Sequence, residues 1–263
     1  NCTGILNGVI NMSHFYATLA KTPSLVEDVQ TPAKAKKIDG MYPSVTTVLG
    51  IIVDDFINNI WKPRRITELA REYPDISWED VMELTYGLRK HPETGKMVPS
   101  SSFGVCVHKR IEELVDDIIH GGTNETVLDA FTPWAEPFLD WIEENNITPK
   151  ATEYIAVDYD LKIAGSIDFL GEDSDGKMFL ADYKCRATEN KGKFYDKDCQ
   201  QLAVESNAIK KEFDLDYLPE CRSVCISTEN KKHFHKVWKV EDVERHLRTA
   251  QLAAKIYWNT RMK

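Results

Sequence analysis

The chain has 263 residues, of which 42% are hydrophobic and 29% charged, a balance typical of a globular protein with one sizeable core. No stretch approaches the ~20 consecutive apolar residues of a membrane-spanning helix, which excludes an integral membrane protein and predicts no membrane partner. The net charge of -9 argues against binding of nucleic acid by bulk electrostatics, although basic side chains gathered in one groove could still bind it.

The N-terminus and the cysteines indicate a reducing compartment. Residues 1–12 contain no basic segment followed by an apolar one, so we expect no secretory signal and a cytoplasmic protein. The six cysteines are scattered without a Cys-x-x-Cys pair, and we expect them to be reduced thiols.

The first part of the chain is predicted to be an extension followed by helices. Residues 1–40 are mixed and weakly periodic, so we interpret them as an extension or arm. Residues 41–102 form a predicted helical region, in which Ser44 and the segment Ser77–Asp80 begin helices. The segment Lys90–Ser102 is rich in Pro, Gly and Ser and is predicted to be a loop.

Residues 103–263 are predicted to form the core, because helical periodicity there alternates with short runs rich in Ile, Val, Phe and Tyr. The three central strands include a tight turn at Asp173–Gly176. The order of elements predicts an α+β fold with a central mixed sheet flanked by helices. The expected segments, in order, are the helices Phe103–His120 and Trp134–Asn145, the strands Thr152–Asp158, Lys162–Gly171 and Lys177–Cys185, the helix Phe194–Phe213, the strands Arg222–Thr228 and His233–Lys239, and the helix Val240–Asn259.

One predicted strand carries an acid and a base on the same face. Asp182 and Lys184 are two residues apart, and side chains alternate along a strand, so both point the same way. An exposed ion pair is the ordinary explanation of this pattern. This strand is apolar on both faces, however, and burial of two charges is costly unless a metal ion compensates.

A second carboxylate is expected near this pair. Asp168 lies in the preceding strand, one hairpin turn away, and shares its predicted face with the small residues Ser166 and Ala164. Neighbouring antiparallel strands lie ~5 Å apart, so Asp168 and Asp182 are close enough to share a metal ion. The alternative for an isolated Gly-x-x-Asp sequence is a glycine bulge followed by an Asp at the end of a strand.

Three other polar residues have both a structural and a functional interpretation. His108 lies on the apolar stripe of its helix. It is either a hydrogen-bonded core histidine or a further ligand of the metal ion, and an imidazole ligand is more natural for Mn²⁺ than for Mg²⁺. Glu153 alternates with Ile155 and Val157, so we expect it to point inward. Gln201 lies on the helix after the three strands, where the alternative is a solvated surface residue.

Taken together, these residues resemble the signature of the RecB-like branch of the PD-(D/E)XK nucleases. The signature maps here onto His108, Glu153, Gly165–Asp168, Asp182–Lys184 and Gln201. The segment Pro43–Thr46 is also similar to one that precedes the histidine helix in mitochondrial genome maintenance exonuclease and its phage relatives. The chain departs from the family at Glu205, where members commonly carry Tyr, and it lacks the clustered cysteines of the iron–sulfur members.

The resemblance implies a restriction-endonuclease-like core and a nuclease that hydrolyses DNA phosphodiester bonds with Mg²⁺ or Mn²⁺ and no iron–sulfur cluster. By analogy it favours an exonuclease acting on single strands or ends, in the host cytoplasm if a phage encodes it. Glu153 and Gln201 would act in support, holding either the catalytic Lys184 or the substrate backbone. The implied metal ligands are His108, Asp168, Asp182 and the carbonyl of Tyr183.

Contacts with DNA are expected from two sets of basic side chains, with ordinary solvated surface as the alternative. The first set follows the catalytic strand and comprises Arg186, Lys191, Lys193 and Lys197. The second set lies in the helical region and comprises Arg64, Arg65, Arg89 and Lys90. Three rival functions stay open: an endonuclease of the same superfamily, a non-catalytic nucleic-acid-binding module, and a metal-binding protein unrelated to DNA.

Overall fold

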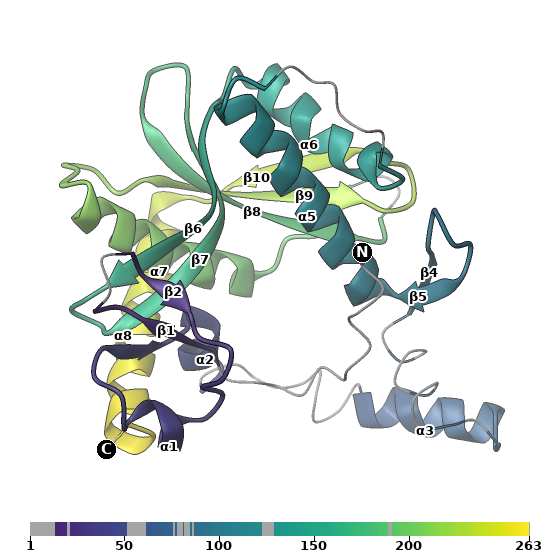
Figure 1. Cartoon of the computed structure of the whole chain (residues 1–263), viewed down its shortest axis with the longest axis horizontal. Helices are drawn as coiled ribbons and strands as arrows, with labels where there is room; N and C mark the ends of the chain where they lie inside the picture. Colours follow the sequence, from purple (N-terminus) through teal and green to yellow (C-terminus); the bar gives the residue numbers. More distant parts are fainter. Residues whose placement is uncertain are drawn as a thin grey trace.

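The computed structural model describes residues 14–19, 22–51, 62–75, 77, 81, 85, 87–122, 129–188 and 191–262. Its centre is a five-stranded mixed sheet in the order β10-β9-β8-β7-β6, with helices on both faces (Figure 1). The α+β architecture with a central mixed sheet flanked by helices is therefore confirmed. No helix in these ranges is both long and apolar enough to cross a membrane.

The sheet combines antiparallel hairpins with one parallel pair. Strands β8 and β9 run parallel, and the other neighbours run antiparallel. A parallel pair needs a crossover connection, which the helix α7 (Asp196–Glu212) provides between β8 and β9. The strands are β6 (Thr148–Asp158), β7 (Ile163–Glu172), β8 (Met178–Arg186), β9 (Glu220–Ser227) and β10 (His233–Val237).

Two helical layers cover the two faces of the sheet (Figure 1). On one face, α5 (Ser100–Ile119) and α6 (Thr132–Glu144) pack on a mainly aromatic core of β7 and β8. On the other face, α7 packs with α8 (Val240–Thr260) on an aliphatic core. The first core includes Phe138, Trp141, Phe169, Phe179 and Tyr183, and the second includes Ile167, Leu170, Leu180, Leu202 and Val243.

A small sheet spans the end of the predicted N-terminal extension and the start of the predicted helical region, and it packs on β7. Its strands β1 (Phe15–Ala17), β2 (Ser24–Leu25) and β3 (Met41–Pro43) pair in the order β2-β1-β3, and the short helix α1 (Pro32–Ala35) precedes β3. Ser44 then caps α2 (Val45–Leu49), accepting a 3.0 Å hydrogen bond from the N–H of Thr47, as predicted. Ser44 also forms a parallel bridge with Ala164, which joins this segment to the edge of β7.

The expected loop at Lys90–Ser102 is wrong for most of its length. Strands β4 (Leu88–Lys90) and β5 (Met97–Pro99) pair as a hairpin, and α5 begins at Ser100. Three-residue strands are too short to show an alternating pattern among the Pro, Gly and Ser residues of this segment. Before this hairpin lies α3 (Lys62–Glu72). The second predicted helix start, Ser77–Asp80, lies outside the described residues except for Ser77.

A buried aspartate attaches the β6–β7 turn to α7. The side chain of Asp158 is 0% exposed and accepts hydrogen bonds from Asn207 Nδ2 at 2.6 Å and Lys211 Nζ at 2.9 Å. It also accepts the backbone N–H groups of Asp160 and Leu161, at 3.1 and 3.0 Å. If the carboxylate is removed, Asn207 and the two backbone N–H groups lose their acceptor, whereas Lys211 keeps Asp160.

We predict that Asp158→Ala lowers the free energy of unfolding by about 3 kcal/mol, because the Asn207 amide and the backbone N–H groups of Asp160 and Leu161 lose a buried charged acceptor. The matched control is Asp160→Ala, since Asp160 also contacts Lys211, at 2.7 Å, but its side chain is 78% exposed. An exposed pair contributes less than about 1 kcal/mol. Urea denaturation measures both changes, and equal losses would contradict the role given to Asp158.

Candidate active site

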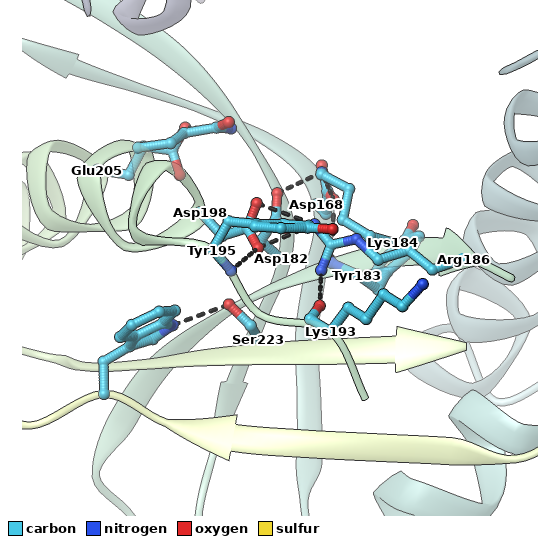
Figure 2. Close-up of polar contacts among 12 residues, drawn as sticks. Asp168, Asp182, Tyr183, Lys184, Arg186, Lys193, Tyr195, Asp198, Glu205 and Ser223 are labelled. Atoms are coloured by element: carbon cyan, nitrogen blue, oxygen red, sulfur yellow. Dashed lines mark hydrogen bonds and ion pairs between the residues drawn. The ribbon is translucent and has the colours of Figure 1, made fainter. Parts of the chain in front are cut away.

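The candidate site lies at a fork in the central sheet, where β7 and β8 stop pairing. Their pairing runs from Glu172↔Met178 only as far as Phe169↔Ala181, whereas β8 stays paired with β9 up to Arg186. Beyond the last β7–β8 pair, the N–H of Tyr183 donates to Oδ2 of Asp168 at 3.2 Å. The Asp168 carboxylate therefore serves as the acceptor that a neighbouring strand would otherwise provide. Figure 2 shows Asp168, Asp182 and Lys184 facing one another in this fork.

The strand alternation used to place Asp168 breaks at that residue. Ile167 packs in the core under α7, but Phe169 packs in the core under α5 and α6. Residues two apart in a regular strand share a face, so the backbone changes phase at Asp168. Regular alternation predicted that Asp168 shares a face with Ser166 and Ala164. Because the alternation breaks, Asp168 lies in the fork instead.

Glu153 is exposed, and the prediction that it points inward is wrong. Its φ of +46° puts the backbone in the left-handed region, which interrupts the alternation of β6. The Glu153 carboxylate accepts a 2.7 Å hydrogen bond from Oγ of Ser166. Desolvation raises the pKa of Glu153, and the hydrogen bond from Ser166 opposes this rise. The negative charge of Asp168 raises the pKa further, and the positive charge of Lys184 lowers it. Glu153 thus lies at the rim of the fork.

Asp182 and Lys184 point the same way, as predicted, and form an ion pair at the fork. Lys184 Nζ contacts Oδ1 of Asp182 and lies 3.5 Å from Oδ2 of Asp168. Burial disfavours the charge of Lys184, but the two carboxylates more than offset this effect, so the Lys184 pKa lies above its ordinary value. The side chain of Asp182 is only 2% exposed, and this burial raises the pKa of Asp182 to about 6.

One carboxylate oxygen of Asp182 lacks a partner. Oδ2 of Asp182 is buried and has no hydrogen-bond donor among the described residues. Nearly all buried polar atoms in proteins are hydrogen-bonded, since an unpaired one costs about 1–3 kcal/mol. An unpaired buried carboxylate oxygen beside a second carboxylate is a position that a cation can occupy.

His108 reaches the fork from α5, on the face of the sheet opposite α7. Its ring centroid lies 4.4 Å from that of Tyr183, and the imidazole hydrogen-bonds to the Tyr183 backbone. This bond favours the protonated ring, so His108 donates and the Tyr183 carbonyl accepts. Burial and then the charge of Lys184 lower the pKa of His108 to about 4, so the ring is neutral at neutral pH. Two of the predicted metal ligands, His108 and the Tyr183 carbonyl, are therefore adjacent.

The donor set fits a divalent cation, although it is not assembled as a ready-made site. Among the described residues, no three His, Cys, Asp or Glu side chains cluster closely enough to hold a metal ion. The Lys184 ammonium provides the positive charge between Asp168 and Asp182. Carboxylate and carbonyl oxygens suit Mg²⁺ and Mn²⁺, and an imidazole suits transition metals such as Mn²⁺. The unpaired Asp182 oxygen supports the same assignment.

Gln201 contacts a carboxyl group that sequence reasoning did not assign to the site. Its Nε2 donates to Oε1 of Glu205 at 3.0 Å, so Gln201 holds Glu205 and not Lys184. Glu205 is 2% exposed, and burial raises its pKa well above the ordinary value, with Asp168 and Asp182 acting in the same direction. The signal was available, because Leu202, Glu205 and Ile209 recur at helical spacing on the buried side of α7.

The basic residues at the end of β8 and just after it differ in how free they are to bind a ligand. The Arg186 guanidinium, 15% exposed, makes two hydrogen bonds to Asp198, at 2.9 and 3.0 Å, so its charge is already neutralised. The other three predicted contacts on this segment are exposed, namely Lys191, Lys193 and Lys197. Their contact with DNA stays a prediction.

The second predicted set of DNA contacts is divided between two elements. Arg89 and Lys90 lie on β4, and Arg64 and Arg65 lie on α3, which Figure 1 shows apart from the central sheet. Arg64 and Arg65 both lie 3.6 Å from Glu68 on the same helix, and the Arg64 side chain is 80% exposed. These are ordinary exposed ion pairs, which leave both guanidinium groups accessible. Their contact with DNA is likewise untested.

We predict that Gly165→Ala destabilises the protein by about 1–3 kcal/mol, because there is no room for a side chain at position 165. A Cβ at Gly165 would lie 2.7 Å from Oε1 of the buried Glu205, which packs directly against this glycine. The control is Gly104→Ala on α5, where the nearest atom to the added Cβ is 3.9 Å away. Thermal or urea unfolding compares the two variants. A harmless Gly165→Ala would contradict the close packing of Glu205 on β7.

We predict that Glu205→Gln stabilises the protein increasingly as the pH rises from about 5 to about 8 in chelator. The folded state holds the Glu205 proton more tightly than the unfolded chain, so wild-type stability falls as the pH rises through this range. Gln keeps an oxygen for the Gln201 hydrogen bond and has no proton to lose. Urea denaturation at both pH values measures the difference, with Glu244→Gln, a 55% exposed side chain, as control. A pH-independent effect would be the contrary result.

Comparison with known proteins assigns no family to the chain, since no family model and no curated protein matches it. Among solved structures it is similar to a proposed exonuclease from Eubacterium rectale, with 13% identity, a TM-score of 0.36, and coverage of 56% of this chain and 64% of that chain. It thus spans less than two thirds of that protein.

Two other solved structures are similar to it at 13% identity: SSO0001, with a TM-score of 0.34 and coverage of 80% of this chain and 84% of that chain, and LHK-Exo in complex with dAMP, with a TM-score of 0.28 and coverage of 59% and 80%. At these TM-scores the likenesses assign no activity, and the function has to be argued from the fork itself.

Proposed function

We propose that the chain is a divalent-metal-dependent nuclease that hydrolyses phosphodiester bonds in DNA. Exonuclease action on single strands or ends is favoured over internal cleavage. The observation that carries the proposal is the fork, where the buried and partly unpaired carboxylate of Asp182 lies beside Asp168 and Lys184. Charged groups are rarely placed in the interior of a sheet without a functional reason.

Phosphodiester hydrolysis needs more than one charged side chain. Enzymes remove roughly 8–23 kcal/mol from the barriers of such slow reactions, which a single lysine does not supply. A bound Mg²⁺ or Mn²⁺ ion would neutralise charge on the phosphate and activate a water molecule. The residues that would hold this ion are Asp168, Asp182, His108 and the Tyr183 carbonyl.

Lys184 acts as a fixed positive charge in this proposal. Its raised pKa keeps it protonated at neutral pH, so it donates hydrogen bonds and does not serve as a general base. Its ammonium would orient the attacking water and stabilise the negative charge that develops on the phosphate oxygens. Asp168 and Asp182 hold the ammonium in place.

His108 provides a neutral nitrogen at the same point. The ring donates one N–H to the Tyr183 carbonyl, which leaves the other ring nitrogen with a free lone pair. A lone pair of this kind can bind a cation or accept a hydrogen bond from water. Gln201 donates to Glu205, which packs against Gly165 of β7, so this hydrogen bond is not made to Lys184.

We predict that the protein cleaves end-labelled DNA with Mg²⁺ or Mn²⁺ and not in chelator, and that Lys184→Ala lowers the rate by at least about 100-fold, the usual effect of losing one preorganised donor. Gel analysis of single- and double-stranded substrates measures the rate. The matched control is Lys177→Ala, which removes the lysine of a second Asp-x-Lys sequence on the exposed hairpin turn and should leave the rate unchanged.

Circular single-stranded DNA separates the two modes of cleavage, since an exonuclease leaves it intact and an endonuclease of the same superfamily opens it. The nuclease proposal fails if neither metal supports cleavage of any substrate. It also fails if Lys184→Ala cleaves as fast as the wild type, because the activity would then come from elsewhere.

A further inference from the structure

Tyr195 is an exposed aromatic residue immediately before α7, and two basic groups lie over its ring. It is 49% exposed. The Arg186 guanidinium lies 4.8 Å from the ring centroid, and Figure 2 shows Arg186 beside Tyr195. The Lys197 ammonium lies 5.8 Å from the same centroid. An aromatic face combined with cations is the arrangement by which proteins bind unpaired bases and their phosphates.

A buried carboxylate holds both the backbone of Tyr195 and the guanidinium over its ring. The backbone N–H of Tyr195 donates to Oδ2 of Asp198 at 3.0 Å, and Asp198 is 4% exposed. Asp198 in turn holds the Arg186 guanidinium through two hydrogen bonds, and Arg186 also donates to the carbonyl of Lys193. The guanidinium that lies over the ring is therefore held in place before any ligand binds.

The ring also lies next to the proposed active site. Arg186 follows Lys184 by two residues on β8, so the two side chains share a face and lie ~7 Å apart along the strand. Asp198 is close enough for its charge to act on both Asp182 and Lys184. A strand whose phosphate lies at Lys184 would bring a neighbouring base to Tyr195.

We infer that Tyr195 is a stacking platform for an unpaired base of single-stranded nucleic acid bound at the fork. This inference rests on the proposed nuclease function and specifies its substrate. A base in a duplex is covered on both faces by its neighbours, so only an unpaired base can stack on the ring. The exposed side chains of Lys191, Lys193 and Lys197 supply charge for the phosphates of the same strand.

Three variants separate stacking from other roles of Tyr195. Tyr195→Ala removes the ring but keeps the start of α7, because Asp198 binds the backbone N–H of this position. Tyr195→Phe keeps the aromatic face. Phe213→Ala is the matched control, because Phe213 is 42% exposed at the other end of α7, about 25 Å along the helix.

The experiment measures binding in chelator, so that no cleavage occurs. Fluorescence anisotropy follows a fluorescein-labelled single strand of about 15 nucleotides, a blunt duplex, and an abasic oligomer of equal length that has phosphates and no bases. Tyr195→Ala should weaken binding of the single strand by about 5- to 100-fold, as expected for one lost stacking contact. Tyr195→Phe and Phe213→Ala should bind within about twofold of the wild type, and affinity for the abasic oligomer should be the same for all variants.

An unchanged affinity of Tyr195→Ala for the single strand overturns the inference. An equal loss on the abasic oligomer also overturns it, because the effect is then electrostatic or structural. The result is independent of the nuclease test. Tyr195-dependent binding without any Lys184-dependent cleavage supports the platform and refutes the nuclease, whereas cleavage without Tyr195-dependent binding does the reverse.

Discussion

The candidate site depends on one feature of the backbone, the exchange of partners along β7. Its second half pairs with β8, but its first half leaves β8 and is bridged at Ala164 to Ser44 of the N-terminal segment. A strand that leaves its neighbour exposes peptide groups, and these groups need other partners inside a protein. Here the Asp168 carboxylate accepts a hydrogen bond from the N–H of Tyr183, and the His108 ring donates one to the Tyr183 carbonyl. Side chains from both faces of the sheet can therefore meet at the fork.

The charged groups around the fork are costly for stability, and this cost indicates function. Two ion pairs, Asp182 with Lys184 and Asp198 with Arg186, follow one another along the same side of β8. Buried ion pairs of this kind stabilise proteins no better than apolar residues of similar size. The unpaired oxygen of Asp182 adds a further penalty that no described donor offsets. Local departures from good packing and pairing of this kind gather at functional sites.

Sequence periodicity predicted the elements of the sheet and the shared face of Asp182 and Lys184, because both depend only on local alternation. It misplaced Glu153, since a positive φ at one residue cancels that alternation and no composition signals it. The strands β1 to β3 have two or three residues each, too few to show a period. The partner of Arg186 also could not be predicted, because Asp198 meets it only after α7 has packed against the sheet. Gln201 and Glu205, in contrast, are four residues apart on α7, a spacing that brings side chains together within a single helix.

The segment next to the fork carries little net positive charge, and this limits how a nucleic acid could be held there. The segment 186–198 contains four basic and three acidic residues, a net charge of +1, and Arg186 is already neutralised by Asp198. Phosphate attraction at this segment is therefore weak, and affinity from counterion release scales with the number of phosphates neutralised. A substrate would have to be held chiefly by stacking on Tyr195 and by a cation at the fork. Both contacts act at one nucleotide step, which favours a short single-stranded segment over a long duplex as the bound species.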